Sequence, residues 1–240
     1  MEWTVCRGGS TALRRNKQPV SSCAILAESK KECKRNMNKK LTFFSRAFLA
    51  GIMIGIGDVI NAMCENRVVG ALLFGLGLLC ILHNGFYLYT GKIGIVWIAS
   101  DKKKEVLNLF VGIICNILGV MLVVKLYMLA NTDFAEKITN TAQTLSSQSA
   151  MSCFLGAIFC GVLMTVATVS YRRENMVAET VITLFCVMVF ILAGFKHCIA
   201  NASMLLFSGC NYVNYLAMIA GNTVGSLCYG YLFGRARENG

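Results

Sequence analysis

The most telling part of this sequence is AGFKHCIAN, residues 193–201, which lies inside an otherwise apolar run from residue 181 to residue 207. Such a run is a candidate membrane span, because a helix needs about 20 apolar residues to cross a bilayer. Lys196 and His197 in its middle are unfavourable unless protein or water receives them. Gly194 lets the helix break beside them, and backbone groups freed by a break must line a cavity. The stretch therefore predicts a broken membrane helix beside a pathway for ions or protons.

The composition is that of a protein that crosses the membrane several times. Of the 240 residues, 56% are hydrophobic and one is proline, and the mean hydropathy is +0.60. The apolar stretches predict six spans, at residues 43–63, 68–99, 106–130, 151–171, 176–209 and 213–233. The second and the fifth are too long for one straight crossing and contain glycine and polar residues near the middle, which favours broken helices.

The net charge of +11 could indicate a nucleic-acid partner, but its distribution points to membrane topology. Residues 1–46 contain eleven lysines and arginines against three acidic residues. If the N-terminus is cytoplasmic, six spans place 18 basic residues inside and two, Arg67 and Lys137, outside. This asymmetry follows the positive-inside rule. It predicts a multi-pass protein of the plasma (cell inner) membrane, with both termini in the cytoplasm and no nucleic-acid partner.

Three regions are expected along the chain. Residues 1–41 lack helical periodicity and are rich in Lys, Arg and Ser, so they are expected to form a basic, disordered cytoplasmic tail. Residues 42–234 are expected to form a six-span transmembrane channel domain, with membrane lipid as its surrounding partner. Residues 235–240 are expected to form a short cytoplasmic C-terminal tail.

The cysteines and histidines do not form a recognisable metal, redox or catalytic motif. The twelve cysteines include no CxxC pair, and several lie singly in the spans, where a free cysteine packs as a small apolar residue. There are two histidines, and no Walker loop, GxSxG or His-x-x-x-His pattern occurs. The protein is therefore expected not to be an enzyme and to hold no metal ion or cofactor.

A pattern in the first three spans recurs in the last three. The second span contains Gly85-Phe86 and the fifth Gly194-Phe195, while the third contains Asn116-Ile-Leu-Gly119 and the sixth Asn222-Thr-Val-Gly225. The two Gly-Phe pairs precede the corresponding asparagines by 31 and 28 residues. Coincidence is the alternative, because glycine and asparagine are common. Since three spans is an odd number, the two halves run in opposite directions, and such inverted repeats place a site near the midplane where the broken helices meet.

These motifs are similar to those of the formate/nitrite transporter family. Residues 194–201 resemble the signature of its fifth helix, residues 88–91 (LYTG) resemble the loop of its second helix, and both Asn-x-x-Gly motifs follow its pattern. The resemblance covers about residues 42–234. It implies an all-α membrane protein with an aquaporin-like six-helix bundle, built from two inverted three-helix repeats with broken helices two and five. It also implies a homopentamer with one substrate path through each protomer.

The resemblance further implies functional residues. His197 corresponds to the family's central histidine, Thr90 to the threonine opposite it, and Asn201 to a polar group that helps to hold the broken fifth helix. Two apolar constrictions are also implied, one formed by Leu88, Tyr89 and Phe190 and the other by Phe74, Leu78 and Leu163.

Two positions depart from the family's pattern. The family usually has a glutamate immediately before the histidine, where this chain has Lys196, and that glutamate commonly faces a lysine before the fourth span, where this chain has Thr144. Another cation, Lys92, follows the Thr-Gly of the second-span loop. These changes put the identity of the substrate in doubt but favour an anion, with Lys196 in the substrate pathway. The alternative is that the Lys196 stem runs along the helix and its amino group reaches the membrane interface.

A small anion must cross an apolar layer in such a protein. A bare charge is costly to transfer, whereas the neutral acid crosses apolar rings easily, and histidine exchanges protons near neutral pH. The sequence therefore predicts a channel or transporter for small monovalent anions of weak acids, such as formate, nitrite or hydrosulfide, linked to protons through His197. The alternatives are a channel for a small neutral solute such as ammonia or water and a non-transporting membrane receptor, although a receptor would not need two paired breaks in opposite halves. For His197 itself, the alternative is a packing role with a bond to a backbone carbonyl.

Two further ionisable residues lie in the predicted spans. His83, at the start of the second-span break, is expected to cap broken backbone. Asp58, in the first span, is expected to serve in helix packing or in a polar contact with the break loops rather than in transport.

Overall fold

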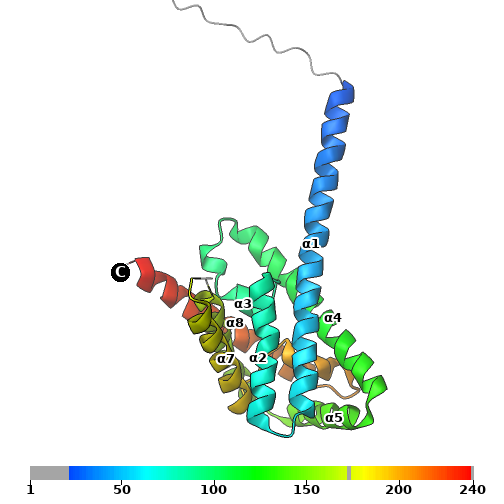
Figure 1. Ribbon diagram of the computed structural model, residues 1–240, viewed down its shortest axis with the longest axis vertical. Coiled ribbons are helices and arrows are strands. Elements are labelled where there is room, and N and C mark those ends of the chain that lie inside the picture. Colours follow the sequence, from blue (N-terminus) through cyan, green and yellow to red (C-terminus); the bar gives the residue numbers. More distant parts are fainter. Residues whose placement is uncertain (1–21, 172–173, 239–240) are drawn as a thin grey trace, which may run out of the picture. The chain divides into compact units, whose positions relative to one another are not determined.

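The protein is built from helices, and the computed structural model describes residues 22–171 and 174–238 (Figure 1). The chain divides into two units, residues 1–40 and 41–240, and the site lies in the second. The α-helices are α1 (Ser22–Met63), α2 (Arg67–Asn84), α3 (Tyr89–Ile93), α4 (Lys102–Ala130), α5 (Thr132–Ser147), α6 (Ala150–Ser170), α7 (Met176–Leu192) and α8 (Tyr212–Glu238). Two short 3-10 helices, η1 (Val96–Ile98) and η2 (Ala200–Leu206), follow α3 and α7.

The membrane-spanning helices lie where the sequence predicts them. Within residues 22–171 and 174–238, five helices are long and apolar enough to cross a membrane: the Asn38–Met63 part of α1, α2, α4, α6 and the Tyr212–Ala236 part of α8. Helix α7 is apolar but has only 17 residues, and the chain continues beyond it through a break into η2. In the same way, α2 continues through a break into α3. Five of the six predicted spans therefore correspond to helices long enough to cross a membrane, and the fifth to the shorter apolar helix α7. The helices at the second and the fifth predicted spans are broken, as expected.

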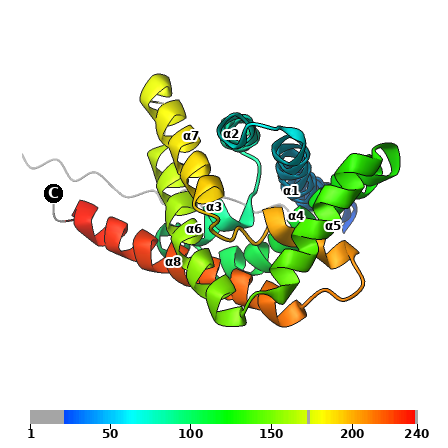
Figure 2. The same cartoon turned by 90° about the horizontal axis from the view of Figure 1, so that it is seen from below.

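Each break occurs at a glycine in the left-handed region. Helix α2 ends at Asn84 and is followed by Gly85 with φ 63°, whose N–H bonds to carbonyl groups of the last turn. Helix α7 ends at Leu192, and Gly194 follows with φ 72°. Residues with a side chain rarely adopt this conformation, so glycine lets each helix stop here. In Figure 2 the segments that follow α2 and α7 turn inward between the surrounding helices.

One asparagine in each half holds the segment that follows the break. In the first half, the buried Asn116 of α4 accepts a hydrogen bond from the Tyr89 N–H (2.8 Å). Its side-chain amide donates to the carbonyl oxygens of Ala47 (2.7 Å) and Tyr87 (2.9 Å). The side chain therefore joins the break segment to α1 through three bonds to backbone groups, which a broken helix leaves in need of partners.

Asn222 of α8 makes the equivalent three bonds in the second half. Its side-chain oxygen accepts from the Cys198 N–H (2.8 Å), and its amide donates to the carbonyl oxygens of Ala157 and Lys196 (2.8 Å each). The break segment after α7 is thus joined to α6 as the segment after α2 is joined to α1. The repeat predicted from the two Asn-x-x-Gly motifs is confirmed at the level of individual hydrogen bonds.

Glycines let the helices that carry these asparagines approach their neighbours closely. Gly51 of α1 lies against the backbone carbonyl of Asn116, and Gly161 of α6 lies against that of Asn222. A side-chain carbon at either glycine would overlap the carbonyl group. Close helix contacts in lipid depend on such small residues.

Gly161→Ala is expected to lower the melting temperature of the protein in detergent by about 5 °C or more, since overpacking costs about 1–3 kcal/mol. The added methyl group would overlap the Asn222 backbone, which cannot move aside as a flexible side chain can. Gly234→Ala on α8 is the control, because no described atom lies within 4 Å of the added carbon. Equal melting temperatures for the two variants would contradict this account of the contact.

Three parts of the fold differ from expectation. Helix α5 is too polar to be predicted as a span, yet one face of it is buried through Phe134, Ile138, Ala142 and Leu145. Residues 22–41 are helical rather than disordered, because they are rich in the good helix formers Lys, Glu, Ala and Leu, while residues 1–21 of the expected tail lie outside the described residues. Helix α8 continues to Glu238, so most of the expected C-terminal tail is helical as well.

Candidate functional site

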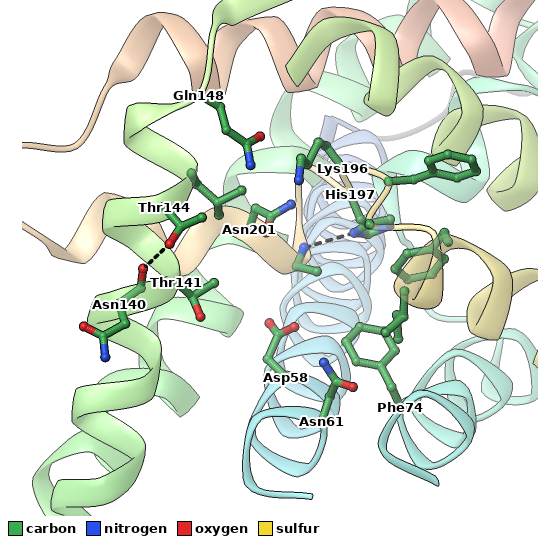
Figure 3. A pocket seen from close by; sticks show the side chains of 16 residues that line it. Asp58, Asn61, Phe74, Asn140, Thr141, Thr144, Gln148, Lys196, His197 and Asn201 are labelled. Atoms are coloured by element: carbon green, nitrogen blue, oxygen red, sulfur yellow. Dashed lines mark hydrogen bonds between the residues drawn. The ribbon is translucent and has the colours of Figure 1, made fainter. Parts of the chain in front are cut away.

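Two cavities lie at different positions along α2. The larger, about 400 Å³, is bounded by α1, α5 and the segment after α7, with Phe74 lining it from α2; we call it the α5-side vestibule (Figure 3). The smaller, about 240 Å³, is lined further along α2 by Leu78, Ile81 and Leu82 and by Lys92 of α3; we call it the Lys92-side vestibule. The described residues give the two cavities no lining residue in common, so the chain between them forms a barrier.

The two break segments meet in this barrier at a buried polar pair. His197 Nε2 lies 2.9 Å from Thr90 Oγ1, although the two residues are 107 positions apart in the sequence. His197 is 1% exposed and Thr90 is 0% exposed. The structure thus brings together the histidine and the threonine that the sequence interpretation places opposite each other.

The second ring nitrogen of His197 sets the direction of this bond. Nδ1 lies 3.0 Å from the backbone nitrogen of Ala200, whose N–H donates to it. A ring nitrogen that accepts a hydrogen bond carries no proton, so the neutral ring holds its proton on Nε2 and donates it to Thr90 Oγ1. Among the described residues, no acceptor is assigned to the Thr90 hydroxyl hydrogen. This hydroxyl group can therefore donate to an oxygen atom of a passing solute.

Aromatic rings cover the histidine on one side of the barrier. The ring of Phe190 in α7 stacks on the His197 ring, with centroids 5.6 Å apart and an interplanar angle of 20°. Phe74 meets the Phe190 ring edge-on at 5.8 Å. Both phenylalanines line the α5-side vestibule. A solute that leaves this vestibule toward the barrier therefore meets an apolar layer.

The structure groups the expected constriction residues differently than the resemblance to the family implies. Leu78 and Leu88 both line the Lys92-side vestibule, whereas Phe74 and Phe190 contact each other beside the other one. Each vestibule therefore has its own pair of apolar residues, and each pair combines one member from each expected constriction. That these pairs constrict the path stays a prediction.

The two remaining constriction residues take part in packing and hydrogen bonding. The hydroxyl group of Tyr89 lies 2.9 Å from Thr223 Oγ1, and the two groups share a hydrogen bond. Leu163 is partly buried and packs against the hydrophobic core. Their expected role in a constriction also stays a prediction.

The side chain of Lys196 lines the α5-side vestibule, together with Asn201 and Thr144. Its backbone N–H donates to the Gly156 carbonyl oxygen (3.3 Å), which fixes the start of the side chain beside α6. Figure 3 shows its amino group near Asn201, with Thr144 on the α5 wall of the same cavity. This placement supports the pathway interpretation of Lys196 over the interface interpretation.

Much of the polar wall of this vestibule comes from α5, of which the sequence interpretation singles out Thr144 alone. Asn140, Thr144 and Gln148 recur at intervals of four residues, so they share one face along α5 and its C-terminal end. An amphipathic pattern between the third and the fourth span is the signal that could have identified them. Asp58 and Asn61 line the same cavity from α1. Asp58 therefore faces a cavity, in addition to the packing role expected of it.

The Lys92-side vestibule also has a basic group in its wall. Lys92 lines this cavity together with Thr168 and Tyr171. His83 Nδ1 lies 3.3 Å from the Tyr171 hydroxyl group, and the capping role expected of His83 stays a prediction. A lysine therefore stands in each vestibule, with the His197–Thr90 pair between them.

A helical bundle in which two broken membrane helices meet at a buried polar pair, with a vestibule on either side, is the architecture of a transmembrane channel or transporter. The family model described as formate/nitrite transporter matches residues 22–234. This chain belongs to the formate/nitrite transporter family and is an integral, multi-pass membrane protein.

Relatives of known sequence agree with this assignment. The formate channel FocA of Escherichia coli K12 is 26% identical over 177 residues, which cover 68% of this chain and 61% of the relative. The formate channel FocA of Haemophilus influenzae is 24% identical over 216 residues, covering 78% of this chain and 76% of the relative. The match thus spans 61% of the length of the E. coli protein, less than two thirds.

Solved structures share the fold. A structure described as a pentameric formate channel with formate bound has a TM-score of 0.67 at 20% identity, covering 84% of this chain and 96% of that chain. A structure described as an FNT family ion channel has a TM-score of 0.68 at 19% identity, covering 88% of this chain and 96% of that chain. These likenesses confirm the predicted fold class.

Proposed function

We propose that this protein is a channel or transporter for small monovalent anions of weak acids, such as formate, nitrite or hydrosulfide. Its family supports this, and so do similar proteins described as formate channels. We also propose a homopentamer in the plasma membrane with both termini in the cytoplasm. A similar structure described as pentameric supports the assembly, and the excess of lysine and arginine in residues 1–46 supports the orientation.

The observation that carries this proposal is the placement of a lysine in each vestibule, Lys196 on one side and Lys92 on the other, with apolar layers and the His197–Thr90 pair between them. A lysine in a narrow cavity raises the local concentration of anions. The apolar layers oppose a bare charge, because an ion taken out of water without compensation is very unfavourable. An anion attracted into a vestibule therefore crosses most easily after it has taken up a proton.

In this proposal His197 links the passage of the substrate to protons. With its proton on Nε2, the His197–Thr90 pair presents hydrogen-bonding groups to a neutral acid without placing a charge in the barrier. To give up a proton, the neutral ring must first take one up at Nδ1, which breaks the bond from the Ala200 N–H. The resulting imidazolium then releases its Nε2 proton to the anion, and the ring is neutral again with its proton on Nδ1. The acid crosses as a neutral molecule and ionises again in the second vestibule.

Flux through the purified protein in liposomes tests the proposal. Uptake of labelled formate, nitrite, lactate and hydrosulfide would be measured at two pH values, with protein-free liposomes as the control. We expect uptake of at least one of these anions, and faster uptake at the lower pH, at which more of the acid is neutral. Flux of water or ammonia without flux of any of these anions would contradict the proposal and support a channel for neutral solutes.

His197→Ala is expected to make the ratio of the flux at low pH to the flux at neutral pH about ten-fold smaller, or to change the selectivity of the protein among anions. The oligomer should still form. The substitution removes the group that exchanges a proton in the barrier and leaves Thr90 and the Ala200 N–H without this partner. Uptake would be compared at several pH values with the parent and with His83→Ala, in which the other, exposed histidine is replaced. An unchanged pH profile together with unchanged selectivity would show that His197 has no part in proton linkage.

A further inference from the structure

An acidic side chain faces the α5-side vestibule, a cavity that we propose to receive anions. Asp58 lies in the last two turns of α1 and, with Asn61, forms the α1 wall of the cavity. Figure 3 shows its carboxyl group directed into the cavity. Its Oδ2 atom is buried, and no hydrogen-bond partner for it occurs among the described residues. An ionisable group within a membrane segment is unfavourable and usually serves a function.

Asp58 lies at the entrance of the apolar barrier. The adjacent Gly57 packs against Phe74, since a side-chain carbon at Gly57 would lie 3.1 Å from the ring. Phe74 contacts Phe190, and Phe190 covers His197. Asp58 thus shares one cavity wall with Phe74, Phe190 and His197, so an anion in this vestibule can approach its carboxyl group beside the aromatic rings.

Few other groups on the cavity wall can hold or release a proton. In the described part of the chain, the segment after α7 contributes Lys196 and His197, α5 contributes neutral polar side chains, and α2 contributes Phe74. Both ring nitrogens of His197 already take part in hydrogen bonds. Asp58, by contrast, has a buried oxygen atom without a partner, on which a proton can reside.

We propose that Asp58 delivers a proton to the anion at the entrance of the barrier, an inference that rests on the proposed function. The O–H bond of the Asp58 carboxyl group breaks, and a new bond forms between that proton and an oxygen or sulfur atom of the substrate. The neutral acid then moves through the Phe74–Phe190 layer, and Asp58 remains as a carboxylate. A hydronium ion from the solution that fills the vestibule then returns a proton to the Asp58 carboxylate and leaves a water molecule.

The charges in the vestibule favour this transfer. Two negative groups close together repel, so an anion beside the Asp58 carboxylate binds a shared proton more readily than either group does alone. The anion, Asp58 and the shared proton together carry one negative charge, which the positive charge of Lys196 on the same cavity wall balances. Lys196 therefore attracts the anion, and Asp58 makes it neutral.

The pH dependence of formate uptake in liposomes tests this role. Asp58→Asn keeps the size of the side chain but cannot release a proton in this way, so uptake at neutral pH should fall about ten-fold or more. Near pH ~5 more of the substrate arrives as the neutral acid, and the loss should shrink to about two-fold. Asp58→Glu retains a carboxyl group and should keep the pH profile of the parent.

The control is Glu136→Gln, which removes an exposed acidic group of α5 that does not line the cavity. Oligomer size in detergent would be measured for every variant. If Asp58→Asn does not assemble, Asp58→Ser compared with Asp58→Glu gives the same contrast between the absence and the presence of a carboxyl group. A parent that transports formate together with an Asp58→Asn variant of unchanged pH profile overturns the role of Asp58. A parent without flux of any weak acid overturns the proposed function itself.

Discussion

Lys196→Glu should reduce the uptake of formate and nitrite about ten-fold or more, because it removes the positive charge of the α5-side vestibule and adds a negative one. The new carboxylate would lie on the cavity wall in place of the lysine and would repel an arriving anion. Lys196→Met should give an intermediate uptake, since it removes the attraction without adding a repulsion. Uptake of both labelled anions in liposomes, with expression and oligomer size checked for each variant, measures the effect.

Thr144→Lys should restore part of the flux that Lys196→Glu loses. Thr144 lines the same cavity as Lys196 (Figure 3), so the double variant recreates the acid–base pair that is usual in the family. Gln143→Lys combined with Lys196→Glu is the matched control, because Gln143 is exposed on the neighbouring position of α5 and does not line the cavity. If Lys196→Glu alone transports as well as the parent, the charge of Lys196 has no part in permeation.

Asn116→Ala and Asn222→Ala should each prevent assembly of a stable protein. Each side chain bonds to three backbone groups in the buried centre of the bundle. A buried polar group without a partner costs about 1–3 kcal/mol, so the three losses together approach the whole stability of an ordinary domain, about 5–15 kcal/mol. The yield of a single oligomeric species in detergent and its melting temperature measure the effect.

The matched control for these variants is Asn84→Ala. Asn84 is exposed at the end of α2, and its amide donates to one carbonyl oxygen of its own helix, that of Cys80. We expect this variant to assemble as the parent does. Assembly of either buried variant at the level of Asn84→Ala would contradict the view that the two asparagines hold the broken helices.

The breaks and the asparagines that hold them could be predicted because local motifs carry them. A glycine beside polar residues in a run too long for one crossing has few explanations in a membrane, and this identifies Gly85 and Gly194. The recurrence of Asn-x-x-Gly at similar distances from both breaks marks Asn116 and Asn222. The bonds that these two residues make could not be read from the motif, since they join segments far apart in the chain.

The α5-side vestibule could be predicted only in part, because its wall combines three distant segments. The polar face of α5 shows that this helix is amphipathic, but the sequence does not tell whether such a face meets water, lipid or a cavity. Asp58 lies on a helix with small residues such as Gly55 and Gly57 on more than one side, so its orientation is not evident. The spans are apolar throughout, and therefore the pairing of Phe74 with Phe190 depends on the packed structure.

The unequal size of the two vestibules has a consequence for inhibitors. At about 400 Å³, the α5-side vestibule falls within the range of cavities that hold drug-sized ligands, about 300–1,000 Å³, whereas the Lys92-side vestibule, at about 240 Å³, falls below it. The larger one also offers a lysine, a carboxyl group and several amides to orient a molecule. We therefore expect a blocker with an acidic head and an apolar body to bind in the α5-side vestibule rather than in the Lys92-side vestibule, and to act from the side of the membrane on which the larger vestibule opens.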